Sequence, residues 1–263
     1  MKNKNTATIS VAMATHNEEA NILRNLTAVH DWVDEIIIAD EKSDDNTVSI
    51  AKKFTKVKIL SVEHEPIFHL TKQKAISACK SDWILQLDTD EVVTSKLKDE
   101  IIKTINSNPT ENGFWINRSN YFLGSFLKKG GVYPDPTIRL YRQGKGYLPC
   151  INVHEQASID GQIGHLQHDL LHYSDPTFSR YLIRHDRYTS LLASEYQSQK
   201  LPLNSLNFIN YFFIKPIYWF VLSYIMHKGF VDGFPGFVFS IYSSLRFPSS
   251  YIKYWEMSHT PHA

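Results

Sequence analysis

The chain has 263 residues, of which 43% are hydrophobic and 21% charged, so it can bury one large core or two smaller ones. Its 28 Lys and Arg residues against 27 Asp and Glu residues leave a net charge of +1, which argues against nucleic acid as a partner. Cys79 and Cys150 match neither a metal-binding spacing nor a disulfide framework, which fits a reducing compartment. Residues 1–6 lack the apolar run of a signal peptide, so the expected location is the cytoplasm.

The first ninety residues alternate between two patterns. Apolar, β-branched runs at residues 8–14, 35–39, 57–62 and 83–87 predict strands. Helical spacing of apolar residues between these runs predicts helices at about residues 18–33, 48–54 and 70–79, with Asn17 as the expected N-cap of the first. Strands that alternate with helices in this way predict a parallel, doubly wound sheet.

Polar and acidic side chains follow three of the predicted strands, at residues 15–18, 40–45 and 88–91. Each segment taken alone could be a solvated turn or a helix cap. Because the carboxyl ends of parallel strands meet at one edge of the sheet, we expect the three segments to converge there. No GxGxxG or GxxxxGK[ST] sequence is present, so the pattern favours a nucleotide held through its base, its ribose and a metal ion.

The strand–THNEE, strand–ADEKSDDNT and strand–LQLDTDE segments resemble, in order and spacing, the family 2 glycosyltransferases of GT-A fold. The resemblance implies a nucleotide-sugar donor, with His16, Glu18 and Asp40 near the nucleoside and with Asp88 and Asp90 serving the cation and the donor sugar.

The sequence departs from the family pattern at three places. His16 stands for a common aromatic residue, Glu41-Lys42 replace small residues, and Gln73-Lys74 occupy a position where relatives often carry Arg-Asn. These departures bear on which donor is used more than on the class of donor.

Transfer from a nucleotide sugar releases a diphosphate, and Mg²⁺ or Mn²⁺ stabilises the negative charge that develops on it. Such hard cations need oxygen ligands, but only one or two of these come from protein carboxylates. We therefore expect Asp90 to bind the metal directly and Asp88 to serve the metal shell or the sugar hydroxyls. Lys74 could approach the donor phosphates or remain solvated on its helix.

The middle of the chain no longer alternates regularly. A helix is predicted at residues 95–106, a hairpin or irregular loop at residues 120–135 and a further strand at residues 138–142. The runs YFLG, GGVYPD, RLYR, VHE and HYS resemble a bacterial subgroup of the family that extends lipopolysaccharide inner cores.

In that subgroup the acidic residue of VHE is a sensible base, and here it is Glu155, next to His154. An inverting transfer needs such a carboxylate on the acceptor side to take the hydroxyl proton. Asp135 is the alternative base, although Pro134 and Pro136 beside it suit a turn. His172 could contact the diphosphate or the metal, or be a hydrogen-bonded structural histidine.

Asp175-Pro176 predicts the start of a helix that runs to about residue 199. Arg180, Arg184 and Arg187 lie on one face of it and could be solvated, or could contact the acceptor, anionic lipid headgroups or core phosphates.

Residues 208–226 are strongly apolar but contain Asn210, Lys215 and Pro216. The run after Pro216 covers residues 217–226, well short of the roughly 20 residues that span a bilayer, so no transmembrane helix is predicted. Aromatic residues beside Lys and Arg favour contact with a membrane surface. The rival explanation is that these helices pack on the catalytic core or form a dimer.

The sequence therefore predicts an α/β protein of GT-A fold, a mostly parallel sheet flanked by helices, with a catalytic domain at residues 1–172 and a helical, aromatic-rich extension at residues 173–263. The expected activity is metal-dependent, inverting transfer of a hexose, glucose from UDP-glucose being the leading choice, to a lipid-linked core oligosaccharide at the inner face of the cytoplasmic membrane. A non-catalytic nucleotide-sugar-binding protein is the alternative. A nucleotidyltransferase is less favoured because no glycine-rich nucleoside loop is present.

Overall fold

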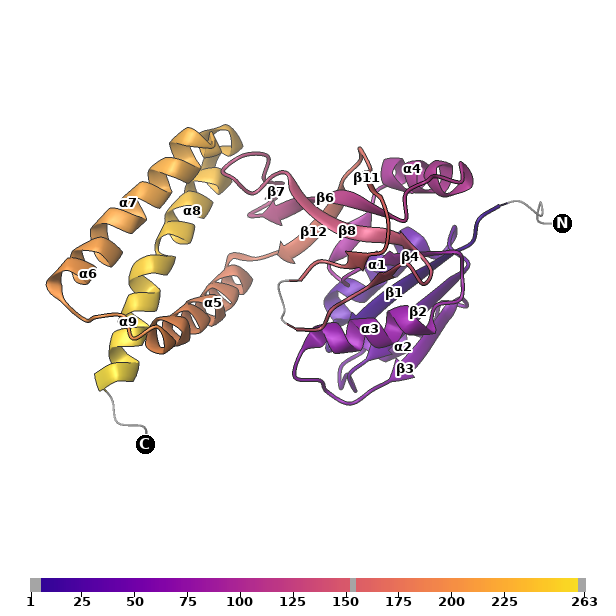
Figure 1. Cartoon of the computed structure of the whole chain (residues 1–263), viewed down its shortest axis with the longest axis horizontal. Helices are drawn as coiled ribbons and strands as arrows, with labels where there is room; N and C mark the ends of the chain where they lie inside the picture. Colours follow the sequence, from indigo (N-terminus) through magenta and orange to yellow (C-terminus); the bar gives the residue numbers. More distant parts are fainter. Residues whose placement is uncertain (1–5, 152–154, 260–263) are drawn as a thin grey trace. The chain divides into compact units, whose positions relative to one another are not determined.

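The computed structural model describes residues 6–151 and 155–259 (Figure 1). The chain separates into two compact units. The first comprises Met1–Arg118 and Asp135–His172, and the second comprises Ser119–Pro134 and Tyr173–Ala263. The division expected from the sequence, at residue 172, differs in the segment Ser119–Pro134, which belongs to the second unit.

The first unit begins with the predicted alternation of strands and helices. In chain order the elements are β1 (Ile9–Thr15), α1 (Glu19–Val29), β2 (Glu35–Asp40), α2 (Thr47–Ala51), β3 (Val57–Ser61), α3 (Phe68–Ala78) and β4 (Trp83–Gln86). The strands lie side by side in the order β3-β2-β1-β4, and each neighbouring pair is parallel. This arrangement confirms the α/β fold class with helices on both faces of the sheet.

Antiparallel strands complete the sheet beyond β4. They are β5 (Glu91–Val93), β6 (Gly113–Phe122), β7 (Ser125–Phe126), β8 (Asp135–Arg142) and β12 (Leu170–Asp175), with α4 (Ser95–Asn106) between β5 and β6. The order continues β4-β8-β6-β12-β5, where β8 pairs antiparallel with both β4 and β6. The short strand β11 (Ile163–His165) pairs parallel with β6, and β9 (Gly146–Tyr147) and β10 (Ser158–Ile159) form a separate antiparallel pair.

Two apolar clusters hold helices against the two faces of this sheet. On one face Ile22 and Leu26 of α1 and Leu97 and Ile101 of α4 are fully buried against alternate residues of β1, β2 and β4. On the other face Ala75 and Ile76 of α3 pack on a smaller cluster. Because β1 and β2 are buried along their whole length, the polar residues that follow them become accessible to solvent only beyond the ends of the strands.

The second unit is mainly helical. It contains α5 (Phe178–Ser198), α6 (Ser205–Ile209), a π-helical segment (Asn210–Ile214), α7 (Lys215–Phe220), a second π-helical segment (Val221–Met226), a 3₁₀ turn (Gly229–Asp232), α8 (Gly233–Ser244) and α9 (Arg246–His259). Buried tyrosines of α5, the first π segment and α9 form its largest apolar cluster, namely Tyr196, Tyr211, Tyr251 and Tyr254.

Lys215 and Pro216, which interrupt the apolar sequence, do not end the helix. Residues 205–226 form one helix of 22 residues, with Pro216 in the first turn of α7. By length and composition alone this helix could cross a membrane, and only 17% of its apolar window is buried. A π-helical segment, Asn210–Ile214, directly precedes Lys215 and Pro216, at the place where the ring of a proline inside an α-helix would clash with a carbonyl.

Two predicted helix caps were also wrong. Asn17 adopts a left-handed turn (φ 55°), and Glu18 takes the N-cap position of α1. Asp175 ends β12, and the α5 N-cap is Thr177, whose hydroxyl accepts a hydrogen bond from the Arg180 N–H at 3.2 Å.

Candidate active site

The carboxyl ends of β1 and β2 are joined by short hydrogen bonds. The Thr15 hydroxyl donates to Asp40 Oδ1 at 2.9 Å, and the Glu41 N–H donates to the Thr15 carbonyl at 2.9 Å. His16 Nδ1 lies 3.0 Å from the Glu41 carbonyl oxygen. Two of the three acid-bearing segments therefore meet at one edge of the sheet, as their strand order requires.

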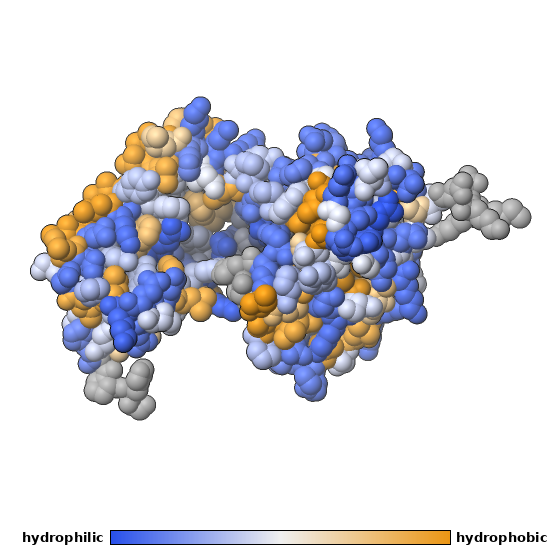
Figure 2. Space-filling model, in the orientation of Figure 1, coloured by the Kyte–Doolittle hydropathy of each residue, from blue (hydrophilic) through white to orange (hydrophobic). Residues whose placement is uncertain are grey.

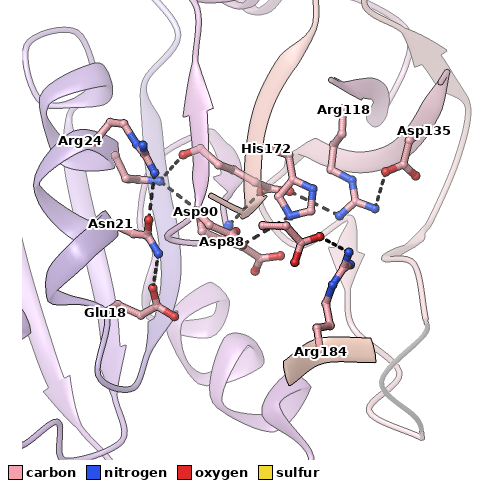
Figure 3. A network of polar contacts seen from close by, with 12 residues as sticks. Glu18, Asn21, Arg24, Asp88, Asp90, Arg118, Asp135, His172 and Arg184 are labelled. Atoms are coloured by element: carbon pink, nitrogen blue, oxygen red, sulfur yellow. Dashed lines mark hydrogen bonds and ion pairs between the residues drawn. The ribbon is translucent and has the colours of Figure 1, made fainter. Parts of the chain in front are cut away.

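The three residues expected near the nucleoside occupy different environments at this edge. His16 is exposed, and its ring centroid lies 5.9 Å from that of His64. Glu18 accepts a hydrogen bond from Asn21 Nδ2 at 2.9 Å (Figure 3). Asp40 is buried, and besides Thr15 it accepts from the Ser43 N–H at 3.0 Å, so its carboxylate shapes the turn. Donor contact by these residues stays a prediction.

The loop after β4 is held in one conformation by its own side chains. The Asp88 N–H donates to Glu91 Oε2 at 2.9 Å, and the Glu91 N–H donates to the Asp88 carbonyl at 3.0 Å. Asn25 of α1 donates to the carbonyls of Asp88 and Glu91 at 3.1 and 2.7 Å. These bonds fasten the third acidic segment to α1, which itself starts at the end of β1.

Asp88 is engaged by two cations. Its Oδ1 pairs with Lys72 of α3, and its Oδ2 accepts from Arg139 Nη2 of β8 at 2.7 Å. Burial alone would raise the pKa of Asp88, but Arg139 and Lys72 outweigh it and hold that pKa well below its usual range. Both oxygens are thus committed within the protein, so Asp88 suits a positioning role better than direct metal binding.

Asp90 is the carboxylate that faces a histidine. His172 Nε2 of β12 lies 3.5 Å from Asp90 Oδ2 (Figure 3). Burial would raise the pKa of Asp90, but its hydrogen bond and charge interaction with His172 outweigh this and lower it. The carboxylate therefore stays ionised at neutral pH.

Mg²⁺ and Mn²⁺ need several oxygen or nitrogen ligands, and Asp90 with its neighbours can supply part of such a set. Among the described residues no group of three or more His, Cys, Asp or Glu side chains gathers as a ready metal cage. One carboxylate with a neighbouring imidazole nevertheless fits a cation whose remaining ligands are donor phosphates and water. Asp90 and His172 are the residues that would hold it.

Three basic residues at this site were missed by the sequence analysis: Lys72, Arg118 and Arg139. Phe114 pairs with Leu140 while Trp115 pairs with Ile138, so Arg139 is the extra residue of a β-bulge. The bulge directs its guanidinium to Asp88 and to the fully buried Glu91, 2.7 Å from each. Arg139 begins the RLYR run that carries the subgroup resemblance, but no sequence signal marks the bulge that brings it to these carboxylates.

Lys72 could have been identified. It lies three and four residues before the buried Ala75 and Ile76, so it shares the inward face of α3. Lys74, for which contact with the donor phosphates and simple solvation were the two alternatives, forms an ion pair with Glu65, and its contact with a donor stays a prediction. Two positions along a helix turn the side chain through about 200°, which accounts for the different surroundings.

Glu155, which was predicted to lie on the acceptor side, is on the segment after β9. Glu155 Oε1 accepts a hydrogen bond from the Ile151 N–H at 2.8 Å. Gln156 Oε1 accepts a hydrogen bond from the Thr137 hydroxyl at 3.0 Å. This bond connects the segment to β8, at a position two residues before Arg139. His154 lies outside the described residues.

The alternative base, Asp135, forms an ion pair with Arg118 Nη2 at 2.9 Å (Figure 3).

In the second unit, the expected arginine face of α5 is not uniform. Arg184 pairs with Asp175, while Arg180 and Arg187 are exposed.

Acidic and basic side chains gather where the parallel strands of this sheet end. This arrangement is typical of an α/β enzyme whose ligand site lies at that edge of the sheet. Residues 10–151 match the family described as glycosyl transferase family 2. The chain belongs to this family and is a glycosyltransferase.

Relatives agree with this assignment, and a solved structure shares the fold. An uncharacterised glycosyltransferase of Rickettsia typhi is 28% identical over 89% of this chain and 82% of its own length. The lipopolysaccharide core biosynthesis glycosyltransferase LpsC of Rhizobium meliloti is 24% identical over 88% of both chains. The crystal structure of S. aureus TarS 1-349 with UDP-GlcNAc, 13% identical, covers 94% of this chain and 88% of its own with a TM-score of 0.51.

Proposed function

We propose that this protein transfers a hexose, with glucose from UDP-glucose as the leading donor, to a lipid-linked lipopolysaccharide core oligosaccharide with inversion at the sugar. The observation that carries the proposal is the position of Asp90, in the loop between β4 and β5, where its carboxylate faces His172 and its loop is hydrogen-bonded to Asn25 of α1. The relative named for lipopolysaccharide core biosynthesis supports the acceptor class.

Each group has a defined chemical task in this scheme. A bound Mg²⁺ or Mn²⁺, held by Asp90 and His172, would stabilise charge on the leaving diphosphate. Lys72 and Arg139 fix Asp88 and add positive charge beside the donor diphosphate. Glu155 takes the proton of the acceptor hydroxyl as that oxygen attacks the sugar.

Substitution of Asp90 tests the donor site. We expect Asp90→Asn to lower glucose transfer from UDP-glucose by about 100-fold or more, because charge stabilisation of a leaving group is worth at least that much. Asp31→Asn is the matched control, since its side chain is 90% exposed. Full activity of Asp90→Asn with Mn²⁺ present would remove the metal role.

Comparison of two variants identifies the base. Glu155→Gln should bind UDP-glucose normally but transfer poorly, whereas Asp135→Asn should retain most of its turnover. The reverse pattern would assign the base to Asp135. NMR of the product should show a β linkage formed from the α-linked donor, and an α linkage would exclude the inverting mechanism.

The same measurements separate transfer from mere binding. A purified protein that binds UDP-glucose but neither hydrolyses nor transfers it, with lipid-linked acceptor and Mn²⁺ present, would support the non-catalytic alternative. Titration with a panel of UDP-, GDP- and ADP-sugars identifies the nucleotide and the sugar.

We further propose that the second unit rests on the inner surface of the membrane through the helix formed by residues 205–226. Six of its exposed apolar residues recur every three or four positions, at Leu206, Ile209, Phe213, Ile217, Val221 and Ile225, and Phe208, Ile214, Tyr218 and Met226 are also exposed. Figure 2 shows hydrophobic surface gathered along the α6–α7 side of this unit. Lys215 does not interrupt the stripe, because its ammonium group lies 3.7 Å from the centre of the Tyr211 ring.

Flotation with phosphatidylglycerol vesicles tests this contact. Ile217→Glu should lower the bound fraction several-fold, because a charge is placed in the apolar stripe. Leu23→Glu on α1 is the matched control, since Leu23 is a similarly exposed apolar residue outside the second unit. Equal loss in both variants would refute a specific role for the helix.

A further inference from the structure

The second unit contains a cavity of about 300 Å³ between α5, α8 and the first residue of α9. Tyr181, Tyr188 and Phe239 supply aromatic walls, and Arg184 and Arg246 bring guanidinium groups to the same cavity. Its volume is at the lower end of the roughly 300–1,000 Å³ typical of small-molecule sites. The cavity is therefore large enough for a phosphorylated sugar or a lipid headgroup.

Arg246 and Arg184 are the two arginines that line the cavity, and their surroundings differ. The Arg246 guanidinium lies 3.9 Å from the centre of the Trp219 ring and 4.8 Å from that of Phe247. Among the described residues no carboxylate lies within ion-pair distance of it. Burial lowers the pKa of Arg246, which reflects the cost of keeping its charge away from water. A bound anion would offset that cost by placing a negative charge beside the guanidinium group.

The other charges around the cavity are already balanced. Arg184 pairs with Asp175, and Lys253 pairs with Asp186 at 2.6 Å. These pairs fix the side chains but add no net charge, so Arg246 leaves a surplus of one positive charge. His185 also lines the cavity, and a bound anion would favour its protonation.

We propose that this cavity binds a phosphate ester, with the phosphate held by Arg246 and Arg184 and the attached ring or chain packed on the tyrosines. Planar guanidinium groups match phosphate oxygens in pairs, and aromatic faces suit the apolar faces of sugar rings or an acyl-glycerol backbone. As a site for the phosphate of the acceptor, the proposal rests on the proposed function. Phosphate binding itself does not require that function to be correct.

The test measures binding by the full chain in EDTA without a nucleotide, so that the donor site is not engaged. Calorimetric titration with glucose 6-phosphate, with glucose as the uncharged control, probes a soluble ester. Sedimentation with phosphatidylglycerol vesicles, with phosphatidylcholine as reference, probes a lipid headgroup. Binding in the first arm supports a soluble or core phosphate. Because the helix at residues 205–226 is itself proposed to contact such vesicles, binding confined to the second arm supports a headgroup site if Arg246→Gln weakens it and overturns the proposal if that variant leaves it unchanged. Binding in neither arm also overturns the proposal.

Arginine variants distinguish the cavity from diffuse attraction. Arg246→Gln should weaken phosphate binding roughly tenfold or more, because charge-assisted hydrogen bonds are lost. Arg187→Gln, the same change on an exposed residue of α5 that does not line the cavity, should alter it less than twofold. Equal weakening in both variants would assign binding to the general positive charge of the helix and overturn the proposal.

A second variant covers the possibility that Arg246→Gln fails to fold. Tyr188 is 47% exposed at the cavity, so Tyr188→Glu should fold and place a competing carboxylate beside the guanidinium groups. We expect it to abolish phosphate binding, and unchanged binding would refute the site. UDP-glucose affinity, measured separately with Mn²⁺, should be unchanged in all these variants, so a failure of the proposed function remains distinguishable.

Discussion

Arg139→Met removes the cation on which the buried carboxylates of the active site depend. Arg139 is 8% exposed and donates from Nη2 to Asp88 and Glu91, at 2.7 Å each. A second bond from Nε reaches Glu91 at 3.2 Å. Breaking a buried pair by removing one partner costs about 3–5 kcal/mol, because a charge is left uncompensated.

The remaining contacts place the expected cost at the lower end of that range. Asp88 keeps Lys72, whereas the fully buried Glu91 keeps the hydrogen bond from the Asp88 N–H at 2.9 Å and, as a counter-charge, the more distant Arg118 at 3.8 Å. We therefore expect Arg139→Met to lower the free energy of unfolding by about 3 kcal/mol at pH 7. Urea unfolding followed by circular dichroism measures this, and the dependence on urea should be unchanged because the surface exposed on unfolding is the same.

The cost should depend on pH. Because Arg139 and Lys72 outweigh burial, the pKa of Asp88 in the folded protein is below its ordinary value of 3.8. The resulting stabilisation is fully present above pH 3.8 and is lost as the pH falls through the folded-state pKa. The difference in stability between wild type and Arg139→Met should therefore be smaller at pH 3 than at pH 5.

A double variant checks the cause. Adding Glu91→Gln to Arg139→Met removes the stranded charge and should recover part of the lost stability. A cost below about 1 kcal/mol for the single variant, or no recovery in the double variant, would refute the argument that uncompensated burial dominates.

Three further predictions follow from particular contacts. Lys72→Met should lower transfer at least tenfold by freeing Asp88, whereas Lys74→Met should change kcat less than twofold, and steady-state kinetics with equal losses would contradict these assignments. Gly236→Ala should lower the melting temperature, although alanine normally favours helices, because its Cβ would lie 2.0 Å from the Gly229 carbonyl oxygen; a raised melting temperature would show that the turn yields freely. Thr94→Ala should cost about 1 kcal/mol in urea unfolding, because its hydroxyl caps α4 through the Leu97 N–H at 3.1 Å, and no cost would mean that water replaces the cap.

The first half of the fold could be predicted because its signals are local and repeated. Buried strands alternate with helices, and parallel order then forces their carboxyl ends to one edge. The helix at Ser95–Asn106 was predicted to the residue, since Leu97, Ile101 and Ile105 mark its buried face. The antiparallel strands that follow have irregular lengths and no such repeat, so neither their order nor β12 was predicted.

The chemistry of the site was only partly accessible for a related reason. Asp88 and Asp90 belong to a recognisable segment, but their partners come from distant parts of the chain. His172 reaches Asp90 because β12 pairs antiparallel with β5, where His172 lies opposite Glu91. Sequence could suggest His172 as a residue to test, but only the strand pairing brings it to Asp90.

In the helix at residues 205–226, Pro216 does not interrupt the helix as the general rule for proline predicts, and the recurrence of exposed apolar residues continues past it. In an α-helix four residues advance the side chain by about 400°, so the four steps from Ile209 to Ile225 would swing an apolar stripe through about 160°. Both π-helical segments lie within this stretch, and a π-helical turn holds more residues than an α-helical turn. The segments therefore counteract the swing and keep these residues exposed together, although Pro216 lies between them. A stripe kept straight by such irregular turns is the form that a flat lipid surface requires, which supports membrane contact more strongly than apolar composition alone.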